Sequence, residues 1–85
     1  MTPQQCRAAR GWLGWSQTDL AKGARVALST VKDFEGGRRT PIANNLAAIR
    51  AALEGAGIGF VYRAEGEATI ACGLTFANPT RDSTA

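Results

Sequence analysis

The sequence contains no histidine and only two cysteines, Cys6 and Cys72, which lie far apart in the chain. Histidine is the commonest general base near neutral pH, and no glycine-rich motif of the kind that cradles phosphates is present. A zinc site takes about four nitrogen or sulfur ligands, which this chain does not offer. We therefore expect no enzymatic activity, no metal and no cofactor. The cysteines are expected to be buried or half-buried thiols, with a Cys6–Cys72 disulfide as the alternative.

Long apolar runs are also missing. No run approaches the roughly 20 residues that cross a bilayer, and the first residues lack the charged-then-apolar order of a signal peptide. With 85 residues, of which 45% are hydrophobic, the chain is long enough for one folded domain and too short for two. We expect a cytoplasmic protein without membrane contact, and pairing with a second copy would enlarge its small core.

Positive charge is concentrated in the first two thirds of the chain. Residues 1–54 carry eight basic and four acidic side chains, whereas residues 55–85 carry two basic and three acidic ones. Because a basic surface attracts polyanions, this asymmetry favours a nucleic-acid partner for the N-terminal part.

Capping signals divide residues 1–55 into four predicted helices. Thr2 and Gln5 match a capping box, and Gly14 ends the first helix. Ser16 and Asp19 start the second helix in the same way. The third helix is expected to start near residue 27 or 28 and to end at the glycine pair 36–37, and the fourth to start near Pro41. The residues expected to face the core are Cys6, Ala9, Leu13, Leu20, Ala21, Ala24, Val31, Phe34, Ile42, Leu46, Ile49 and Leu53.

Period-two alternation replaces the helical pattern after Gly57. Ile58, Phe60 and Tyr62 alternate with Gly59, Val61 and Arg63, and a second alternation covers residues 70–76, on the other side of a polar turn that contains Gly66. This pattern predicts a β-hairpin. The predicted organisation is a helical domain over residues 1–55, a hairpin over 56–76 that serves dimerisation, and a flexible polar tail over 77–85.

Two short helices joined by a tight turn, the second followed by glycines and two arginines, are typical of a helix-turn-helix. The residues that carry this pattern are Ser16, Gln17, Leu20, Ala21, Val26, Thr30, Val31, Phe34, Glu35 and the run Gly37-Arg38-Arg39-Thr40-Pro41. Their spacing resembles the phage-repressor and Cro-type (xenobiotic-response-element type) DNA-binding domain over about residues 3–54. The resemblance implies a mainly α, lambda-repressor-like fold of four to five helices, here followed by the β-hairpin.

A DNA-binding surface follows from this resemblance and from the polar outer side of the third helix. A recognition helix must be thin and polar on one side to enter the roughly 12 Å wide major groove. In the family, the residue in the position of Gln17 binds a phosphate, and free amides at the start of the second helix add to anion binding. The loop after the third helix is expected to follow the DNA backbone. The candidate DNA-binding residues are Ser16, Gln17, Ala27, Leu28, Ser29, Thr30, Lys32, Asp33, Arg38, Arg39, Thr40 and Asn44.

Two of these residues have open alternatives. Leu28 could contact a thymine methyl group, or it could be an exposed or dimer-facing leucine. Asp33 is unfavourable near phosphates unless it accepts a hydrogen bond from a cytosine amino group or pairs with Lys32 or Arg25.

Two positions depart from the family pattern. Arg25 stands where glycine is usual, so a left-handed residue or a different turn is expected. Ala27 stands where serine or threonine usually caps the recognition helix, so this helix should lose a cap. The resemblance also implies that Arg10 and Glu35 pair to join the first and third helices.

The hairpin has two possible roles. Because a lone two-stranded hairpin is marginal in water, its apolar side either packs on the fourth helix or pairs with a second chain. Pairing is favoured, since two recognition helices about 34 Å apart would match the half-sites of an inverted repeat. The candidate dimer-interface residues are Phe60, Tyr62, Ile70, Cys72, Leu74 and Phe76.

The sequence therefore predicts a sequence-specific DNA-binding transcriptional regulator. We expect a dimeric repressor that binds double-stranded DNA through its third helix and is associated with the nucleoid when bound. The alternative is a protein-interaction module, or an antitoxin-like or antiactivation regulator, whose hairpin binds a protein partner.

Overall fold

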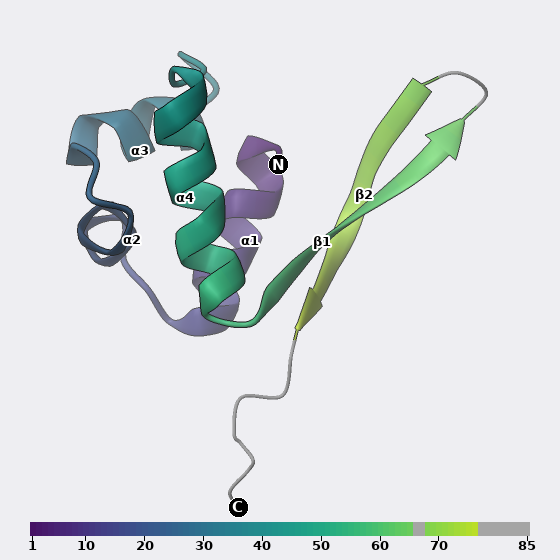
Figure 1. The fold of residues 1–85 in the computed structure, drawn as a ribbon, viewed down its shortest axis with the longest axis horizontal. Helices are drawn as coiled ribbons and strands as arrows, with labels where there is room; N and C mark the ends of the chain where they lie inside the picture. The colour runs from purple at the N-terminus through teal and green to yellow at the C-terminus, as the bar shows by residue number, and fades with distance from the viewer. Residues whose placement is uncertain (66–67, 77–85) are drawn as a thin grey trace, which may run out of the picture.

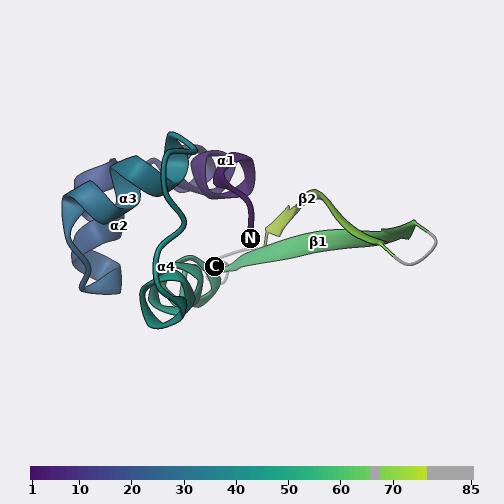
Figure 2. The ribbon, with the colours of Figure 1, turned by 90° about the horizontal axis from the view of Figure 1, so that it is seen from above.

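The computed structural model describes residues 1–65 and 68–76, and within the strands it describes the side chains of residues 58–63 and 73–75. Four helices are followed by two strands that pair as an antiparallel hairpin. The hairpin extends away from the helices, as Figures 1 and 2 show from two directions. The described part is thus mainly helical, as predicted, and the predicted tail over 77–85 lies outside it.

Helix α1 (Pro3–Leu13) begins at the predicted capping box. The backbone N–H of Gln5 donates to Thr2 Oγ1 (3.1 Å), and the backbone N–H of Thr2 donates to Gln5 Oε1 (2.9 Å). At the other end Gly14 adopts a left-handed conformation (φ 71°), which glycine accepts without strain. Local sequence therefore fixes both ends of α1.

Helix α2 (Gln17–Ala24) also begins at a capping box. The Asp19 N–H donates to Ser16 Oγ (3.0 Å), and the Ser16 N–H donates to Asp19 Oδ2 (2.9 Å). The helix ends at Arg25, which has φ 58° and is therefore left-handed. The first of the two outcomes considered for this position is the one observed.

Helix α3 (Leu28–Glu35) follows after a short turn and has no side-chain hydrogen bond at its N-cap, Ala27. Its C-cap is Gly36, and the next residue, Gly37, has φ 73°. Both ends of α3 thus lie where the sequence placed them.

Helix α4 (Ala43–Gly55) begins two residues later than predicted, because Pro41 precedes the helix and Ile42 occupies its N-cap. Ile49 and Leu53 are fully buried, but Ile42 is 69% exposed. The prediction that Ile42 faces the core was wrong: Ile42 is the N-cap residue, outside the helix, and does not continue the buried stripe that Ile49 and Leu53 form.

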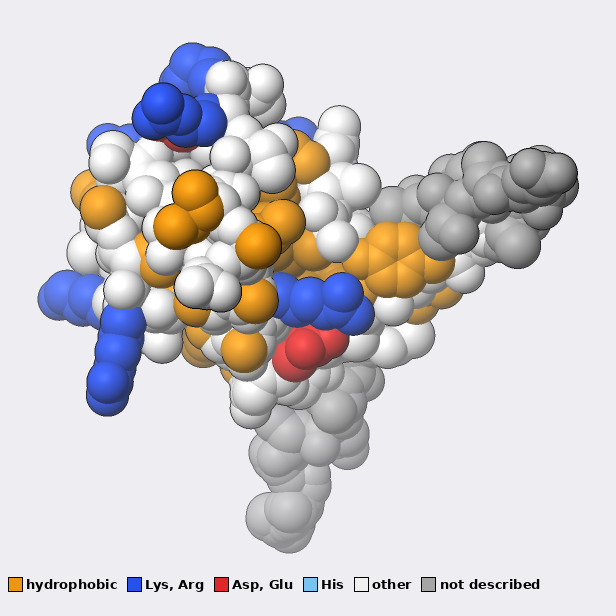
Figure 3. All heavy atoms as spheres, turned by 45° about the horizontal axis from the view of Figure 1, so that its top comes forward, with side chains coloured by type: hydrophobic (Ala, Val, Ile, Leu, Met, Phe, Trp, Pro, Cys, Tyr) orange, Lys and Arg blue, Asp and Glu red, His pale blue; other side chains and the backbone are white. Residues whose placement is uncertain are grey.

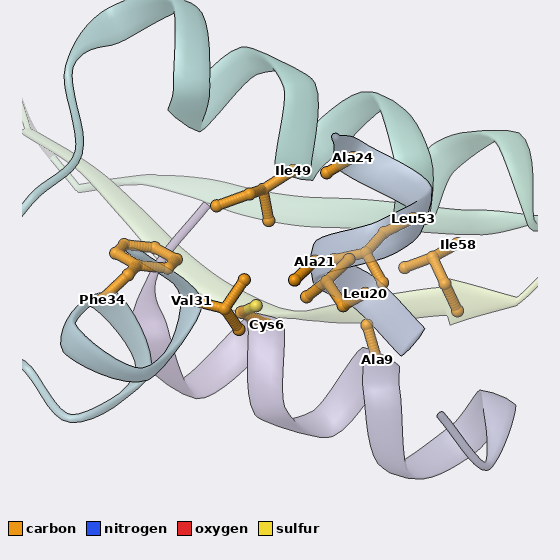
Figure 4. Packing of buried hydrophobic residues seen from close by; sticks show 10 residues of the cluster. All are labelled: Cys6, Ala9, Leu20, Ala21, Ala24, Val31, Phe34, Ile49, Leu53 and Ile58. Atoms are coloured by element: carbon orange, nitrogen blue, oxygen red, sulfur yellow. The ribbon is translucent and has the colours of Figure 1, made fainter. Parts of the chain in front are cut away.

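The core lies between the four helices and the base of the hairpin. Figure 4 shows its side chains pointing toward one another from α1, α2, α3, α4 and from Ile58, the first residue of the first strand. Burial of each large aliphatic side chain contributes about 1.5–3 kcal/mol to stability. Because Val31 and Phe34 belong to this cluster, the same contacts hold α3 against the other helices. The buried hydrophobic residues are Cys6, Ala9, Leu20, Ala21, Ala24, Val31, Phe34, Ile49, Leu53 and Ile58.

The base of the hairpin, formed by β1 (Ile58–Glu65) and β2 (Ala68–Phe76), is bonded to α1. The buried Gln5 side chain donates through Nε2 to the carbonyl oxygens of Val61 (3.3 Å) and Gly73 (2.9 Å). One amide group from α1 therefore holds both strands, which fixes the direction in which the hairpin leaves the helices.

The register of the hairpin is interrupted once. Phe60 pairs with Leu74 and Val61 with Gly73, but the next partner of the first strand, Tyr62, is Ala71. Cys72 is thus an extra residue of β2, as in a β-bulge, and a one-residue shift reverses the alternation beyond it.

The interruption bears on the predicted dimer face, which assumed unbroken alternation. Phe60, Tyr62 and Leu74 are half-buried in the single chain, and Phe60 and Leu74 pack against the core. In the pairing of β1 with β2, Ile70 is the partner of Arg63, whereas Leu74 is the partner of Phe60. The side chains of the remaining predicted interface residues, Ile70, Cys72 and Phe76, lie outside the described residues.

Candidate nucleic-acid interface

Helix α3 has one side in the core and the other in solvent. Val31 is 0% exposed and Phe34 is 4% exposed, so these two side chains anchor the inner side as predicted. Leu28 is half-buried and packs against the same cluster. Leu28 is therefore not a fully exposed leucine, and its contact with the core supports the amino end of α3.

The turn between α2 and α3 depends on Arg25. Its backbone N–H donates to Lys22 O (3.2 Å), and the next N–H, that of Val26, donates to Ala21 O (3.0 Å). These bonds close the end of α2, and the left-handed residue lets α3 start within a few residues. Because Ala27 supplies no cap, the first amides of α3 have no side-chain partner at this surface.

A buried polar network joins the first three helices. The predicted ion pair forms between Arg10 and Glu35, with Nη2 to Oε1 at 2.7 Å and Nε to Oε2 at 2.8 Å. Glu35 is 2% exposed and also accepts hydrogen bonds from Gln17 Nε2 (3.0 Å) and from the Cys6 thiol (3.1 Å). A single carboxylate of α3 is thus held by α1 and α2 together.

The network also sets the protonation of its members. Burial by itself raises the pKa of Glu35, but the hydrogen bonds from Arg10, Gln17 and Cys6 outweigh it, so the pKa lies below its ordinary value. Burial, followed by the bond to Glu35, raises the pKa of the Cys6 thiol. Cys6 is a free cysteine, so the alternative of a disulfide to Cys72 does not occur in this structure.

The outer side of α3 carries short polar and charged side chains. Ser29 and Lys32 are exposed, as is Ala27 at the N-cap, and Thr30 and Asp33 are half-buried. Most of these side chains are short, so this side of the helix is narrow enough for a groove.

A hollow lies beside this outer side, between α3 and the start of α4. Five of its lining residues are candidate DNA-binding residues, and the other three, Pro41, Ile42 and Asn45, are not. Asn44 and Asn45 are neighbours in the first turn of α4, so they point in different directions around the helix. Asn45 lines the hollow, whereas Asn44 is exposed. The lining residues are Ser29, Thr30, Asp33, Arg39, Thr40, Pro41, Ile42 and Asn45.

The loop between α3 and α4 supplies positive charge at the same surface. Arg38, Arg39 and Thr40 are exposed. Figure 3 shows Lys and Arg side chains gathered at the end of the molecule where this loop lies. Arg38 Nε lies 3.3 Å from Asp33 Oδ1, so the partner of Asp33 is Arg38 and not Lys32 or Arg25, the two partners considered from the sequence.

The amino end of α2 holds the remaining predicted contacts. Ser16 Oγ accepts the capping hydrogen bond from Asp19, which leaves its hydroxyl hydrogen for another acceptor. Gln17 is half-buried because its Nε2 is bonded to Glu35, a partner that sequence reasoning did not find. Spacing along the chain gives no signal for that bond, since it joins residues on two different helices.

A metal site or a membrane span would require other features of the chain. Among those residues, no group of three or more Cys, Asp or Glu side chains could hold a metal ion. None of the described helices is long and apolar enough to cross a membrane.

Residues 17–35 form two helices joined by a tight turn, and the second helix presents a polar side next to a basic loop. These features define a helix-turn-helix DNA-binding protein. A helix-turn-helix family model matches residues 7–55, which is more than half of the chain. The chain belongs to the Cro- and XRE-type helix-turn-helix family of DNA-binding regulators. A search of curated proteins finds no match to it.

Proposed function

We propose that this DNA-binding regulator is a dimeric repressor that reads an inverted-repeat operator through α3. It would act in the cytoplasm, on the nucleoid, by occupying an operator that overlaps a promoter. The observation that carries the proposal is the continuity of three features on one surface: the polar outer side of α3, the hollow beside it and the basic loop that follows.

Phosphate binding is supported by the loop and by the two helix starts. Of the two loop arginines, Arg38 is paired with Asp33, whereas the side chain of Arg39 makes no hydrogen bond or ion pair within the part of the chain that the structure describes. Arg39 and Thr40 therefore face the hollow without a competing partner. We assign phosphate contacts to these two residues, to Ser16 and Gln17 at the start of α2, and to Asn44.

Base reading is assigned to the outer side of α3. Ser29 and Lys32 are exposed, and neither side chain has a hydrogen bond within the described residues. Serine can donate or accept in the major groove, and lysine donates to guanine O6 and N7. Thr30 lies deeper and contributes to the wall of the hollow.

Dimerisation is assigned to the hairpin. Both of its outer edges carry unpaired backbone groups in the single chain, because the described sheet has two strands. A hairpin of this kind gains stability when it is extended to four strands. To read the two half-sites of an inverted repeat, the two copies of α3 in such a dimer would have to lie about 34 Å apart.

Fluorescence anisotropy with labelled duplexes tests the DNA-binding surface. An operator is first selected from random duplexes, and its affinity and that of a scrambled duplex are then measured over a range of salt concentrations. Replacing Arg39 with Ala should weaken both duplexes and reduce the salt slope by about 1. The matched control is Arg50→Ala, since Arg50 is held by Glu54 (2.9 Å) on α4 and should leave the slope unchanged.

Two results would contradict this part of the proposal. An unchanged salt slope in the Arg39→Ala variant would remove the loop from the DNA contacts. A wild-type chain that bound no duplex but bound a protein partner tightly would instead favour the interaction-module alternative. Transcription in vitro from a promoter that contains the selected operator distinguishes repression from activation.

Sedimentation equilibrium tests the dimer. Leu74 also packs against the core of its own chain, so Leu74→Glu tests the interface in a variant that keeps its helices; that variant should sediment as a monomer, whereas Thr75→Glu, at the neighbouring exposed position, should remain dimeric. Circular dichroism checks that both variants keep their helices. If the wild type is monomeric at micromolar concentration, or if both variants behave alike, the hairpin is not the dimer interface.

A further inference from the structure

Asp33 is an acidic residue on a surface otherwise suited to DNA. Its side chain is 37% exposed and lines the hollow together with Ser29 and Thr30. A carboxylate in this position is repelled by phosphates, so its presence in a DNA-binding surface needs a specific reason.

The loop after α3 contacts both the backbone carbonyl and the side-chain carboxylate of Asp33. Its backbone carbonyl accepts hydrogen bonds from the N–H groups of Arg38 (2.9 Å) and Arg39 (3.3 Å). Its carboxylate Oδ1 pairs with Arg38 Nε at 3.3 Å. The guanidinium reduces the repulsion from phosphates and fixes one carboxylate oxygen. The other oxygen, Oδ2, accepts no hydrogen bond from any residue in the described portion of the chain.

The chemistry of an ionised carboxylate restricts what Oδ2 can bind. It only accepts hydrogen bonds, and in the major groove only the amino groups of cytosine (N4) and adenine (N6) donate. Guanine O6 and thymine O4 would face it with lone pairs. Adenine also places its N7 acceptor beside the amino group, close to the second carboxylate oxygen, whereas cytosine has a C–H group on that side. A carboxylate therefore favours cytosine.

We propose that Asp33 is a specificity-determining residue that selects cytosine at one position of each half-site, and that Arg38 is the residue that positions it. The inference rests on the proposed placement of α3 in the major groove. It gives the two loop arginines different tasks: Arg39 binds phosphate on any sequence, whereas Arg38 acts through Asp33 on one base pair.

The test compares base preference at every operator position in four proteins: wild type, Asp33→Asn, Arg38→Ala and Arg39→Ala. The wild type should prefer cytosine at one position by roughly 5- to 150-fold, the range for a good base contact. Asp33→Asn keeps the volume and adds a donor, so the preference at that position alone should change to adenine, which asparagine binds through N6 and N7.

The arginine variants separate positioning from general binding. Arg38→Ala should reduce the discrimination at the Asp33 position by several-fold, and Arg39→Ala should weaken all duplexes alike while that discrimination is kept. An operator preference that is identical in wild type and Asp33→Asn at every position would overturn the inference and leave the proposed function standing. If the wild type itself selects no sequence, the proposed function fails and this inference fails with it.

Discussion

The buried Glu35 carboxylate is the strongest local test of how α3 is held. Glu35→Ala removes the acceptor of three side chains, Arg10, Gln17 and Cys6. Leaving one member of a buried ion pair without its partner costs about 3–5 kcal/mol. Arg10 is 19% exposed and keeps a bond from Nη1 to the Trp15 carbonyl (2.9 Å), so we expect the lower end, about 3 kcal/mol.

The exposed pair on α4 provides a matched comparison. Arg50 and Glu54 lie at a similar distance, 2.9 Å, but their side chains are 45% and 44% exposed. An i,i+4 pair of this kind contributes about 0.3–0.5 kcal/mol, so Glu54→Ala should change the free energy of unfolding by about 0.5 kcal/mol at most. The difference between the two variants isolates the effect of burial.

Thermal and urea unfolding, followed by far-ultraviolet circular dichroism, measure both variants. For a chain of this size, about 3 kcal/mol corresponds to a fall in Tm of roughly 12–24 °C, whereas Glu54→Ala should stay within about 4 °C of the wild type. Replacing Arg10 and Glu35 together with Met and Leu should be milder than Glu35→Ala, because no charge is then left buried. Equal losses in Glu35→Ala and Glu54→Ala would refute the role assigned to the network.

Three further predictions concern the same region. Because the pKa of Glu35 is lower in the folded chain than its ordinary 4.5, the stability that Glu35 contributes is complete above that value and is lost as the pH falls through the folded pKa. The urea midpoint should therefore fall as the pH is lowered below about 4.5, and less so in Glu35→Gln. Arg25→Gly should raise Tm by about 4–8 °C, since glycine adopts φ 58° without the strain of a side chain, and a lower Tm would show that the arginine is not strained. Ala27→Ser should add about 1 kcal/mol to the free energy of unfolding by capping α3, and no change would mean that water already satisfies those amides.

Features that depend on neighbours in sequence were predictable. The capping boxes at Thr2 and Ser16 and the glycines after α1 and α3 act within about one helical turn, so their residue types indicate where each helix begins or ends. The left-handed conformation of Arg25 was one of the two outcomes that the family resemblance implied, because glycine is usual at this position. The pairing of Arg10 with Glu35 came from the family resemblance and not from local pattern.

Contacts between segments that lie far apart in the chain could be identified only in the tertiary structure. From the sequence, Lys32 and Arg25 were the partners considered for Asp33, and only the path of the loop brings Arg38 to it instead. In the same way, the bond between Gln17 and Glu35 depends on how α2 packs against α3. The extra residue at Cys72 interrupts an alternation that the sequence shows as regular, because strand register is set by pairing and not by one strand alone.

By itself, the sequence determined the helices, most of their ends and the sides of α1, α2 and α3 that enter the core, since capping and apolar spacing are local. The tertiary structure decided which polar atoms meet: the carboxylate of Glu35 at the junction of three helices, the carboxylate of Asp33 under the loop, and the amide of Gln5 between two strands. The physical reason is that a side-chain hydrogen bond depends on separations of about 3 Å between segments far apart in the chain, and only the packing of the core fixes those separations.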